Sequence, residues 1–246
     1  MKIALIGYGK MGKAIEEIAI ERGHEVVLKV TSQSQNWEKS LEHTDVAIEF
    51  TRPDSAVHNI TTLINTGIPT VTGTTGWYDR YAEIEQLIQQ NNGSFLAATN
   101  FSIGVNLFFA INTYVAKLMN TQPEYDVSME EIHHLQKLDA PSGTAITLAE
   151  QIIAQIDGKN NWNCIENENS EIATNNETLP IYAFREDGVP GTHTINYTSD
   201  IDTITLTHTA HNRRGFALGA VLAAEHVAHK KGIFTMNDVL NIDKIK

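Results

Sequence analysis

Apolar positions in the first hundred residues form short continuous runs, each followed by polar or glycine-containing segments. Such runs, roughly four to eight residues long, are typical of buried parallel strands. Between several of them, apolar residues recur at helical spacing, which predicts helices at 10–22, 54–65 and 81–90. The predicted strands are KIALIG (2–7), HEVVLKV (24–30), DVAIEFT (45–51), PTVTGTTG (69–76) and SFLAATN (94–100). Strands that alternate with helices favour right-handed crossovers and an open, doubly wound parallel sheet.

The pattern changes after a helix predicted at 105–119. The later strands follow one another with few helices between them, which is typical of a mixed or antiparallel sheet. A hairpin turn is expected at Ser199-Asp200, and one helix at 142–156 interrupts the strands. These strands are predicted at 125–134, 179–186, 191–198 and 202–210.

The final apolar stretch, GFALGAVLAAEHVAHKKG (215–232), predicts a helix with Gly232 as its C-cap. The fold class is therefore α/β with an inserted α+β domain. We predict a doubly wound domain of residues 1–103 and 214–246, and an inserted domain of residues 104–213.

The stretch GYGKMG fits the pattern G-x-G-x-x-G with Gly7, Gly9 and Gly12. It follows a predicted strand and opens a predicted helix, as the Rossmann-type dinucleotide fingerprint requires. The helix N-terminus would offer free N–H groups and a positive dipole end to a pyrophosphate. The alternative is a turn whose glycines serve packing alone.

The dinucleotide fingerprint usually includes an acidic residue at the end of the second strand, where it binds the ribose 2′-hydroxyl. The corresponding segment here is VVLKVTSQS, in which Lys29, Thr31 and Ser32 occupy that neighbourhood. Without a carboxylate, the main repulsion against a 2′-phosphate is absent. We therefore expect NADPH to be accepted at least as well as NADH.

Two further segments follow predicted strands at the end where open α/β sheets bind ligands. These are GTTG (73–76) and ATNFS (98–102). They are candidates to line the cofactor, although GTTG could be a plain turn and Asn100 a helix-capping residue.

Residues 130–145, EEIHHLQKLDAPSGTA, gather histidines, a lysine and a helix start within sixteen positions. His133 and His134 end a predicted strand, and neighbouring side chains on a regular strand face opposite ways. Proline favours the first turn of a helix, so Pro141 predicts a helix start whose N–H groups are unpaired. These N–H groups belong to Ser142, Gly143 and Thr144. Together with nearby hydroxyls and Lys137, they would form a socket for a carboxylate or phosphate. Alternatively, Ser142 only caps the helix and Lys137 is a solvated surface residue.

A second polar cluster precedes the last helix and contains His208, His211, Arg213 and Arg214. It could bring a guanidinium to a second anionic group, or it could be an ion-pair network that joins domains. A zinc site built from His133, His134, His208 and His211 lacks H-x-x-x-H or H-E-x-x-H spacing, so we predict no metal.

Composition limits the function classes. The chain carries 18 Lys and Arg against 30 Asp and Glu, a formal net charge of −12. This balance disfavours non-specific binding to nucleic acid or to an anionic membrane. Cys164 is the only cysteine, which excludes an internal disulfide and a cysteine-rich metal site. The N-terminal apolar run is too short for a membrane span, and a cytoplasmic location is expected.

Residues 130–145 closely resemble the signature E-x-H-H-x-x-K-x-D-A-P-S-G-T-A of the 4-hydroxy-tetrahydrodipicolinate reductase (dihydrodipicolinate reductase) family. The resemblance extends over nearly the whole chain. GYGKMG, EFTRP, GTTG, ATNFSIGVN, REDGVPGTH and HTAHNRRGFALGA occur in the family's order.

The resemblance implies NAD(P)H-dependent reduction of 4-hydroxy-tetrahydrodipicolinate in lysine and diaminopimelate biosynthesis, by a homotetramer assembled through the inserted domain. His133 would donate the proton, with Lys137 as its catalytic partner. The small dicarboxylate substrate would be held by His134, Ser142, Gly143 and Thr144. The cofactor, NADPH or NADH, would be lined by Gly7, Tyr8, Gly9, Lys10, Met11, Gly12, Gly73, Thr74, Thr75, Ala98, Thr99, Asn100 and Phe101. The alternatives are another small-acid dehydrogenase, of an aspartate or homoserine type, and a non-catalytic NAD(P) sensor.

Overall fold

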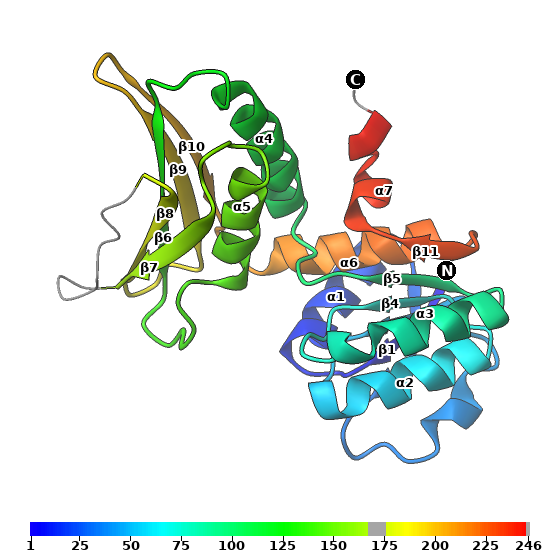
Figure 1. Cartoon of the computed structure of the whole chain (residues 1–246). Helices are drawn as coiled ribbons and strands as arrows, with labels where there is room; N and C mark the ends of the chain where they lie inside the picture. The colour runs from blue at the N-terminus through cyan, green and yellow to red at the C-terminus, as the bar shows by residue number, and fades with distance from the viewer. Residues whose placement is uncertain (167–175, 245–246) are drawn as a thin grey trace. The chain divides into compact units, whose positions relative to one another are not determined.

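The chain divides into two compact units in a computed structural model that describes residues 1–166 and 176–244 (Figure 1). Unit 1 consists of Met1–Asn106 and Arg214–Lys246, and unit 2 consists of Leu107–Arg213. The ligand-binding roles expected of the two domains remain predictions.

Unit 1 contains a six-stranded sheet in the order β11-β5-β4-β3-β1-β2, and every neighbouring pair is parallel. The predicted doubly wound parallel sheet is confirmed. The strands are β1 (Lys2–Ile6), β2 (Glu25–Val30), β3 (Val46–Glu49), β4 (Thr70–Thr72), β5 (Ser94–Ala97) and β11 (Gly232–Phe234).

Helices cover both faces of this sheet because successive side chains of a strand point to opposite sides. Ile3 and Leu5 of β1 pack in one cluster with residues of α1 and α6. Ala4 and Ile6 pack on the other side, with Leu63 of α2. The helices and 3₁₀ turns of unit 1 are α1 (Lys10–Glu21), η1 (Trp37–Ser40), α2 (Pro53–Asn65), η2 (Tyr78–Arg80), α3 (Tyr81–Gln90), α6 (Arg214–Val227), α7 (Met236–Leu240) and η3 (Ile242–Lys244).

The end of the last long helix differs from the sequence-based expectation. The helix α6 ends at Val227, and Gly232 is not its C-cap but the first residue of β11. This three-residue strand pairs with β5 and is followed by α7, which begins with a capping box at Thr235. Both elements are too short to show a periodic apolar pattern. The residues AHKK (228–231) are compatible with a helix, so the predicted helix continued to Gly232, past its true end.

Unit 2 is a five-stranded sheet in the order β10-β9-β6-β8-β7. Strands β6, β9 and β10 are antiparallel, whereas β8 pairs in parallel with both β6 and β7, so the predicted mixed sheet and its final hairpin are confirmed. Strand β7 was not predicted, because NWNCI is only five residues long and two of them are asparagines, which are uncommon in strands. The elements are α4 (Ile103–Met119, which begins in unit 1), β6 (Asp126–His133), α5 (Gly143–Ile153), β7 (Asn161–Ile165), β8 (Thr178–Arg185), β9 (Thr192–Thr198) and β10 (Thr203–Thr209).

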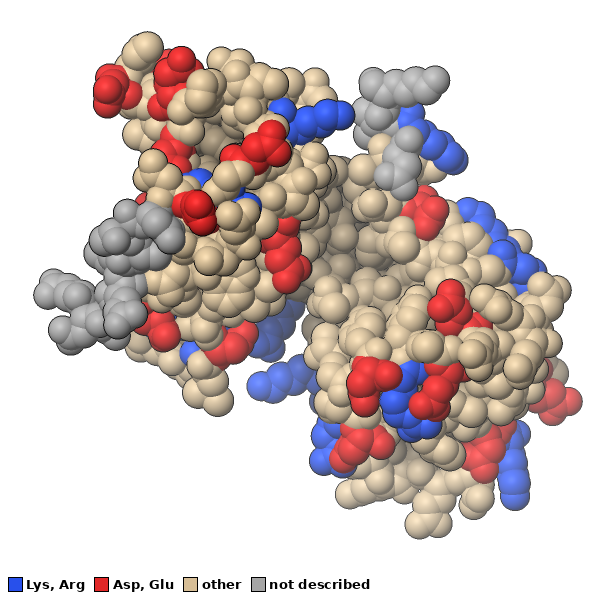
Figure 2. All heavy atoms as spheres, in the orientation of Figure 1, with Lys and Arg blue, Asp and Glu red and all other residues tan. Residues whose placement is uncertain are grey.

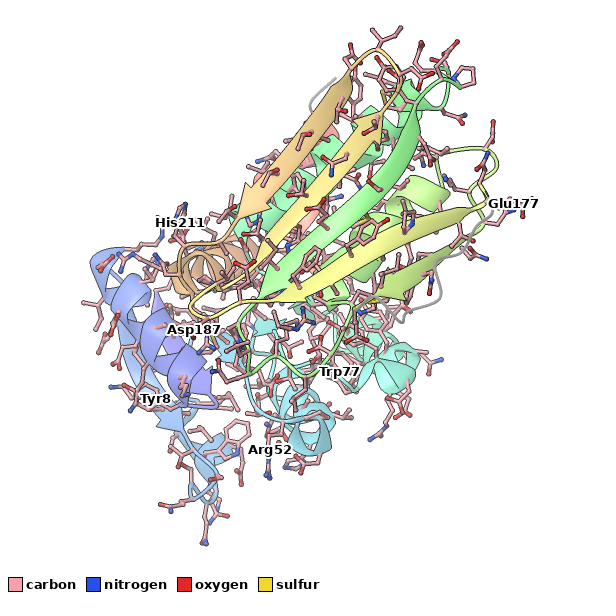
Figure 3. All side chains as sticks on the ribbon, turned by 90° about the vertical axis from the view of Figure 1, so that its left-hand side faces the viewer. Tyr8, Arg52, Trp77, Glu177, Asp187 and His211 are labelled. Atoms are coloured by element: carbon pink, nitrogen blue, oxygen red, sulfur yellow. The ribbon has the colours of Figure 1, made fainter. Side chains whose placement is uncertain are left out.

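One face of this sheet packs against helices α4 and α5, and Figure 3 shows the opposite face turned to the viewer. On β6 the buried positions alternate strictly. Val127 and Met129 belong to the apolar core, and the same face continues with Glu131 and His133. The strand therefore carries two buried titratable side chains to its end, directly beyond the core.

Acidic and basic side chains are interspersed on the face shown in Figure 2. Among the described residues, no helix has the length and apolar character needed to cross a bilayer. The expected cytoplasmic location remains a prediction.

Gly219 of α6 contacts the chain that leaves β5. A Cβ atom at Gly219 would lie 1.7 Å from the Phe101 carbonyl oxygen. Alanine normally improves a helix over glycine by about 1 kcal/mol, but here overpacking should cost more, roughly 1–3 kcal/mol net. We expect Gly219→Ala to lower the melting temperature by roughly 3–10 °C, measured by circular dichroism.

The matched control is Gly215→Ala in the same helix. A Cβ there would meet only Ser102 Oγ, at 3.7 Å, an ordinary contact. This variant should melt at or slightly above the wild-type temperature. Equal melting temperatures for the two variants would contradict the close approach of α6 to Phe101.

Candidate active site

The glycine turn after β1 has a geometry that only its glycines permit. Gly7 has a φ angle of +99°, and a Cβ on it would lie 1.9 Å from the Phe50 carbonyl oxygen. The N–H groups of Gly7 and Tyr8 donate to the Val30 carbonyl oxygen at 3.0 and 2.8 Å. Gly9 is the N-cap of α1, and a Cβ on it would meet nothing within 4 Å. The start of α1 is therefore open to a phosphate group.

Two open clefts share this turn at the carboxyl end of the sheet. The larger, of about 580 Å³, is lined by Ile6, Gly7, Tyr8, Gly9, Val30, Thr31, Ser32, Ser34, Trp37, Phe50, Thr51, Arg52, Ser55 and Asn59. The smaller, of about 300 Å³, is lined by Gly7, Gly9, Lys10, Met11, Phe50, Thr51, Pro53, Gly73, Thr74 and Thr75. These sets bring together eight of the predicted cofactor residues, Gly7, Tyr8, Gly9, Lys10, Met11, Gly73, Thr74 and Thr75. These lining residues fit a dinucleotide, because the glycine turn and the start of α1 are available to its phosphates.

The other predicted cofactor residues occupy different positions. Gly12 is buried, and a Cβ on it would lie 2.6 Å from the Gly7 carbonyl oxygen, so it serves the close packing of the turn. The segment Ala98–Phe101 follows β5, and Ala98 N–H donates to the Thr72 carbonyl oxygen at 3.2 Å. Phe101 is buried and lies 5.6 Å from the Phe50 ring. Contact of residues 98–101 with a cofactor stays a prediction.

The larger cleft carries hydroxyls and a guanidinium where the ribose acid is usually found. Thr31, Ser32 and Arg52 line it, and no Asp or Glu is among its lining residues within the described chain. Lys29 is not among them: its Nζ lies 2.5 Å from Glu16 Oε1 and 5.0 Å from the centre of the Tyr8 ring. Figure 3 labels Tyr8 and Arg52, two polar side chains that line the larger cleft. Arg52 is the one Lys or Arg that lines this cleft within the described chain, and its contact with a 2′-phosphate stays a prediction.

In unit 2, the buried carboxylate of Glu131 is surrounded by four polar groups. Its Oε1 accepts from Arg185 Nη1 at 3.1 Å, and its Oε2 accepts from Ser142 N–H at 3.1 Å. His133 Nδ1 lies 3.2 Å from Oε2 but is poorly aligned for a hydrogen bond, and His193 Nε2 lies 3.9 Å away. Burial tends to raise the pKa of Glu131, but His133 and Ser142 outweigh it and hold this pKa at about 2. The carboxylate is therefore ionised at any working pH.

His193 of β9 is the second buried histidine beside this carboxylate. Its ring lies 5.1 Å from the His133 ring, and its Nε2 lies 3.0 Å from Ser142 Oγ. Burial, followed by the charge of His133, lowers the pKa of His193 to about 3. His193 is thus neutral at working pH.

A loop after β6 places Lys137 near this cluster. Lys137 Nζ donates to both carboxylate oxygens of Asp139, at 2.8 and 2.7 Å. The loop is attached to β8, because Arg185 Nη2 donates to the Asp139 carbonyl oxygen at 2.6 Å. The Lys137 side chain is only 19% exposed, whereas the Asp139 side chain is 64% exposed. The contact of Lys137 with a substrate stays a prediction.

The start of α5 differs from the predicted one. Ser142 is the N-cap, and its Oγ accepts from Ala145 N–H, so Pro141 lies before the helix rather than in its first turn. The N–H of Ser142 was expected to be unpaired, but it donates to Glu131. Gly143 is exposed, and a Cβ on it would meet nothing within 4 Å. At this helix start the open position is therefore Gly143, the Ser142 side chain is turned inward, and the binding of an anion there stays a prediction.

The other polar residues singled out in the sequence are spread over several elements and do not form one site. His134 follows β6, and its buried Nδ1 has no hydrogen-bond partner among the described residues. His208 of β10 lies 5.9 Å from the Phe108 ring, and burial lowers its pKa. His211 and Arg213 are exposed. Arg214 pairs with Glu21 inside unit 1, so that ion pair does not join the two units.

Glu131, His133 and His193 each offer one ligand atom, and these atoms lie within 4.8 Å of one another. This set differs from the four histidines considered in the sequence, since His134, His208 and His211 are not part of it. The guanidinium of Arg185 lies against the same carboxylate and opposes a second cation there. The absence of a catalytic metal stays a prediction.

Comparison with known proteins identifies the family. Residues 1–101 match the profile described as dihydrodipicolinate reductase, N-terminus, and residues 104–240 match the profile of its C-terminus. The chain belongs to the dihydrodipicolinate reductase family. It is 50% identical over 241 residues to 4-hydroxy-tetrahydrodipicolinate reductase of Christiangramia forsetii, covering 98% of both chains. It is 35% identical over 246 residues to the enzyme of the same name from Methanocaldococcus jannaschii, covering 98% of this chain and 82% of that one.

The fold agrees with this membership. A dipicolinate-bound dihydrodipicolinate reductase from Paenisporosarcina sp. TG-14 superposes with a TM-score of 0.77 at 23% identity, covering 96% of this chain and 97% of that chain. The resemblance seen in the sequence motifs is thereby confirmed as family membership, and the chain is an oxidoreductase of this family.

Three residues of the polar cluster around His133 were not predicted from the sequence: Glu131, Arg185 and His193. Glu131 had a local signal, because it lies two positions before His133 and so on the same face of a strand. The other two come from β8 and β9, whose register with β6 is not readable from the chain. Gly191 was also missed; a Cβ on it would lie 2.9 Å from His133 Nε2.

Proposed function

We propose that this protein reduces 4-hydroxy-tetrahydrodipicolinate to tetrahydrodipicolinate with NAD(P)H, in lysine and diaminopimelate biosynthesis. The observation that carries the proposal is the position of His133 at the end of β6, in one cluster with Lys137 and the start of α5. Family membership supports the same reaction, as does the dicarboxylate-type ligand named for the Paenisporosarcina enzyme.

The residues divide the chemistry between them. A bound nicotinamide cofactor supplies the hydride. Water leaves the hydroxyl-bearing carbon of the substrate, hydride is added at that carbon, and the neighbouring carbon then gains a proton. His133 donates this proton from its ring, because histidine can carry a proton near neutral pH and release it to carbon.

The substrate's carboxylates are held by positive charge and free N–H groups. Lys137 supplies the ammonium, and the start of α5 at Gly143 supplies an open N–H and the positive end of the helix dipole. His134 and Thr144 complete the proposed substrate site, whereas Ser142 supports it from inside, because its N–H and its hydroxyl are both used within the protein. The same groups stabilise negative charge that develops during reduction.

The proposal is tested by an assay in which the substrate is made in situ and NADPH or NADH oxidation is followed. Substrate-dependent oxidation is expected. Oxidation with aspartate or homoserine substrates instead would assign another dehydrogenase activity. Cofactor binding without oxidation of any of these substrates would leave an NAD(P) sensor.

NADPH should serve at least as well as NADH, because Thr31, Ser32 and Arg52 line the cleft in place of the usual acid. The Arg52 side chain is 77% exposed and lies 3.4 Å from Asp54, so it is available to a 2′-phosphate. We expect Arg52→Gln to raise KM for NADPH roughly tenfold, the equivalent of one charge-assisted hydrogen bond. KM for NADH should change little.

Arg80→Gln is the matched control, because Arg80 is an exposed arginine of the same unit that pairs with Glu83. It should leave both KM values unchanged. A strong NADH preference in the wild type, or an equal loss of both cofactors in Arg52→Gln, would refute this account of the cleft.

The uncovered face of the sheet in unit 2 supports assembly into a homotetramer. Threonines pair across β9 and β10 on this face, as in Thr192 with Thr209 and Thr194 with Thr207, and Phe184 is 45% exposed. A broad, uncovered sheet face with threonine methyl groups and an exposed aromatic side chain fits a subunit interface. Sedimentation equilibrium should give four times the chain mass of 27.3 kDa.

A further inference from the structure

Glu131 links the proton donor to the substrate socket through one carboxylate. Its side chain is fully buried, at 0% exposure. One oxygen lies 3.2 Å from His133 Nδ1, close enough for a charge contact although not aligned for a hydrogen bond, and it also accepts the Ser142 N–H at the start of α5. The other oxygen accepts from Arg185. Among the described residues, no other carboxylate oxygen lies within 4.0 Å of the His133 ring nitrogens.

We infer that Glu131 is a positioning residue of the reaction, which holds the protonated His133 ring and the first turn of α5 in one fixed arrangement. The inference rests on the proposed function, because it assigns Glu131 a role through His133. Buried carboxylates that orient a histidine and stabilise its imidazolium are a recurring device of active sites. Glu131 touches neither substrate nor cofactor in this scheme.

The charges around His133 decide whether removal of the Glu131 carboxylate weakens or strengthens protonation of the ring. Glu131 on β6 favours the protonated ring. Arg185 on β8 and Lys137 in the loop oppose it, although Lys137 is paired with Asp139. His193 on the neighbouring strand β9 is neutral, because burial lowers its pKa to about 3. Burial also lowers the pKa of His208 on β10. The carboxylate is therefore the one favourable charge in direct contact with the ring among the described groups.

The first test is Glu131→Gln. The amide keeps the size of the side chain, and its oxygen can still accept the Ser142 N–H, so the variant removes charge more than shape. The His133 proton should then be lost at lower pH. We expect the alkaline limb of kcat/KM to move down by about one to three pH units, the usual effect of one close opposite charge. Glu131→Asp should move the limb back toward the wild-type position.

Arg185→Met gives a prediction of opposite sign. Removing this cation takes away the positive charge that opposes protonation of His133 and leaves the Glu131 carboxylate in place, so the alkaline limb should move to higher pH. Arg185→Lys keeps a positive charge and should stay closer to wild type. A purely structural role for the two residues would lower kcat at every pH and leave the limb where it is, and that result would overturn the inference.

His133→Gln separates failure of this inference from failure of the proposed function. If His133→Gln retains wild-type turnover, the proposed function of His133 fails. If His133→Gln is inactive while Glu131→Gln keeps the wild-type pH profile, only the role of Glu131 fails. Circular dichroism of each variant establishes that the comparison is made between folded proteins.

Discussion

Replacing His133 with alanine is expected to lower kcat by about 10²-fold or more, the scale of losing a general acid. The His133 ring is 10% exposed and ends β6, so it is held by the sheet yet reachable from outside. Its neighbours cannot take over. The pKa of His193 is lowered to about 3, so that ring carries no proton at working pH, and Glu131, whose pKa is about 2, is already ionised.

The effect should appear in kcat with the fold intact, measured by steady-state kinetics and circular dichroism. His58→Ala is the matched control, since His58 is an exposed histidine of α2 in unit 1 and has no role in the scheme. It should retain wild-type turnover. Near-normal turnover in His133→Ala would refute its assignment as proton donor.

The fold was predictable where a segment is long enough to show a period. The buried strands of the first sheet and the helices between them follow from continuous and helical apolar spacing. Strands β7 and β11 were missed because they are short, and β11 contains only Gly232, Ile233 and Phe234. Such strands form because neighbouring strands already present free N–H and carbonyl groups, and a sequence pattern does not record this.

The site was predictable only where its residues are close in sequence. His133, Lys137 and the start of α5 lie within one loop. Arg185 and His193 join them through strand pairing, since His133 is opposite Arg185 in the β6–β8 register and Glu131 is opposite His193 in the β6–β9 register. A one-residue change in either register would move these side chains to the other face. Spacing along the chain cannot decide that register.

The socket at α5 shows how one contact changes a local prediction. A helix start was expected to offer the Ser142 N–H to substrate, as the general rule for helix ends suggests. Glu131, eleven residues earlier, accepts that N–H instead. The pairing needs β6 and α5 to pack together, so it depends on tertiary structure, and it shifts the open N–H to Gly143.

Replacing Lys137 with alanine is expected to lower kcat by a similar factor, about 10²-fold or more, because its cation acts on charge that develops during reduction. Lys137 Nζ is bonded to both oxygens of Asp139, and this hydrogen bonding holds the pKa of Asp139 below its usual value. Asp139 thus remains an anion that holds the ammonium of Lys137 in place. In the alanine variant no described cation takes this position in the loop.

The kinetic pattern distinguishes a catalytic partner from a binding residue. A cation that holds substrate and transition state equally would raise KM and leave kcat unchanged. A cation that stabilises developing charge lowers kcat, which is the expected result, measured at saturating substrate. Lys117→Ala, which removes an exposed lysine from α4 of the same unit, is the control and should leave both constants unchanged. A rise in KM alone in Lys137→Ala would reduce Lys137 to a substrate-binding residue and leave His133 as the sole group acting on the reaction.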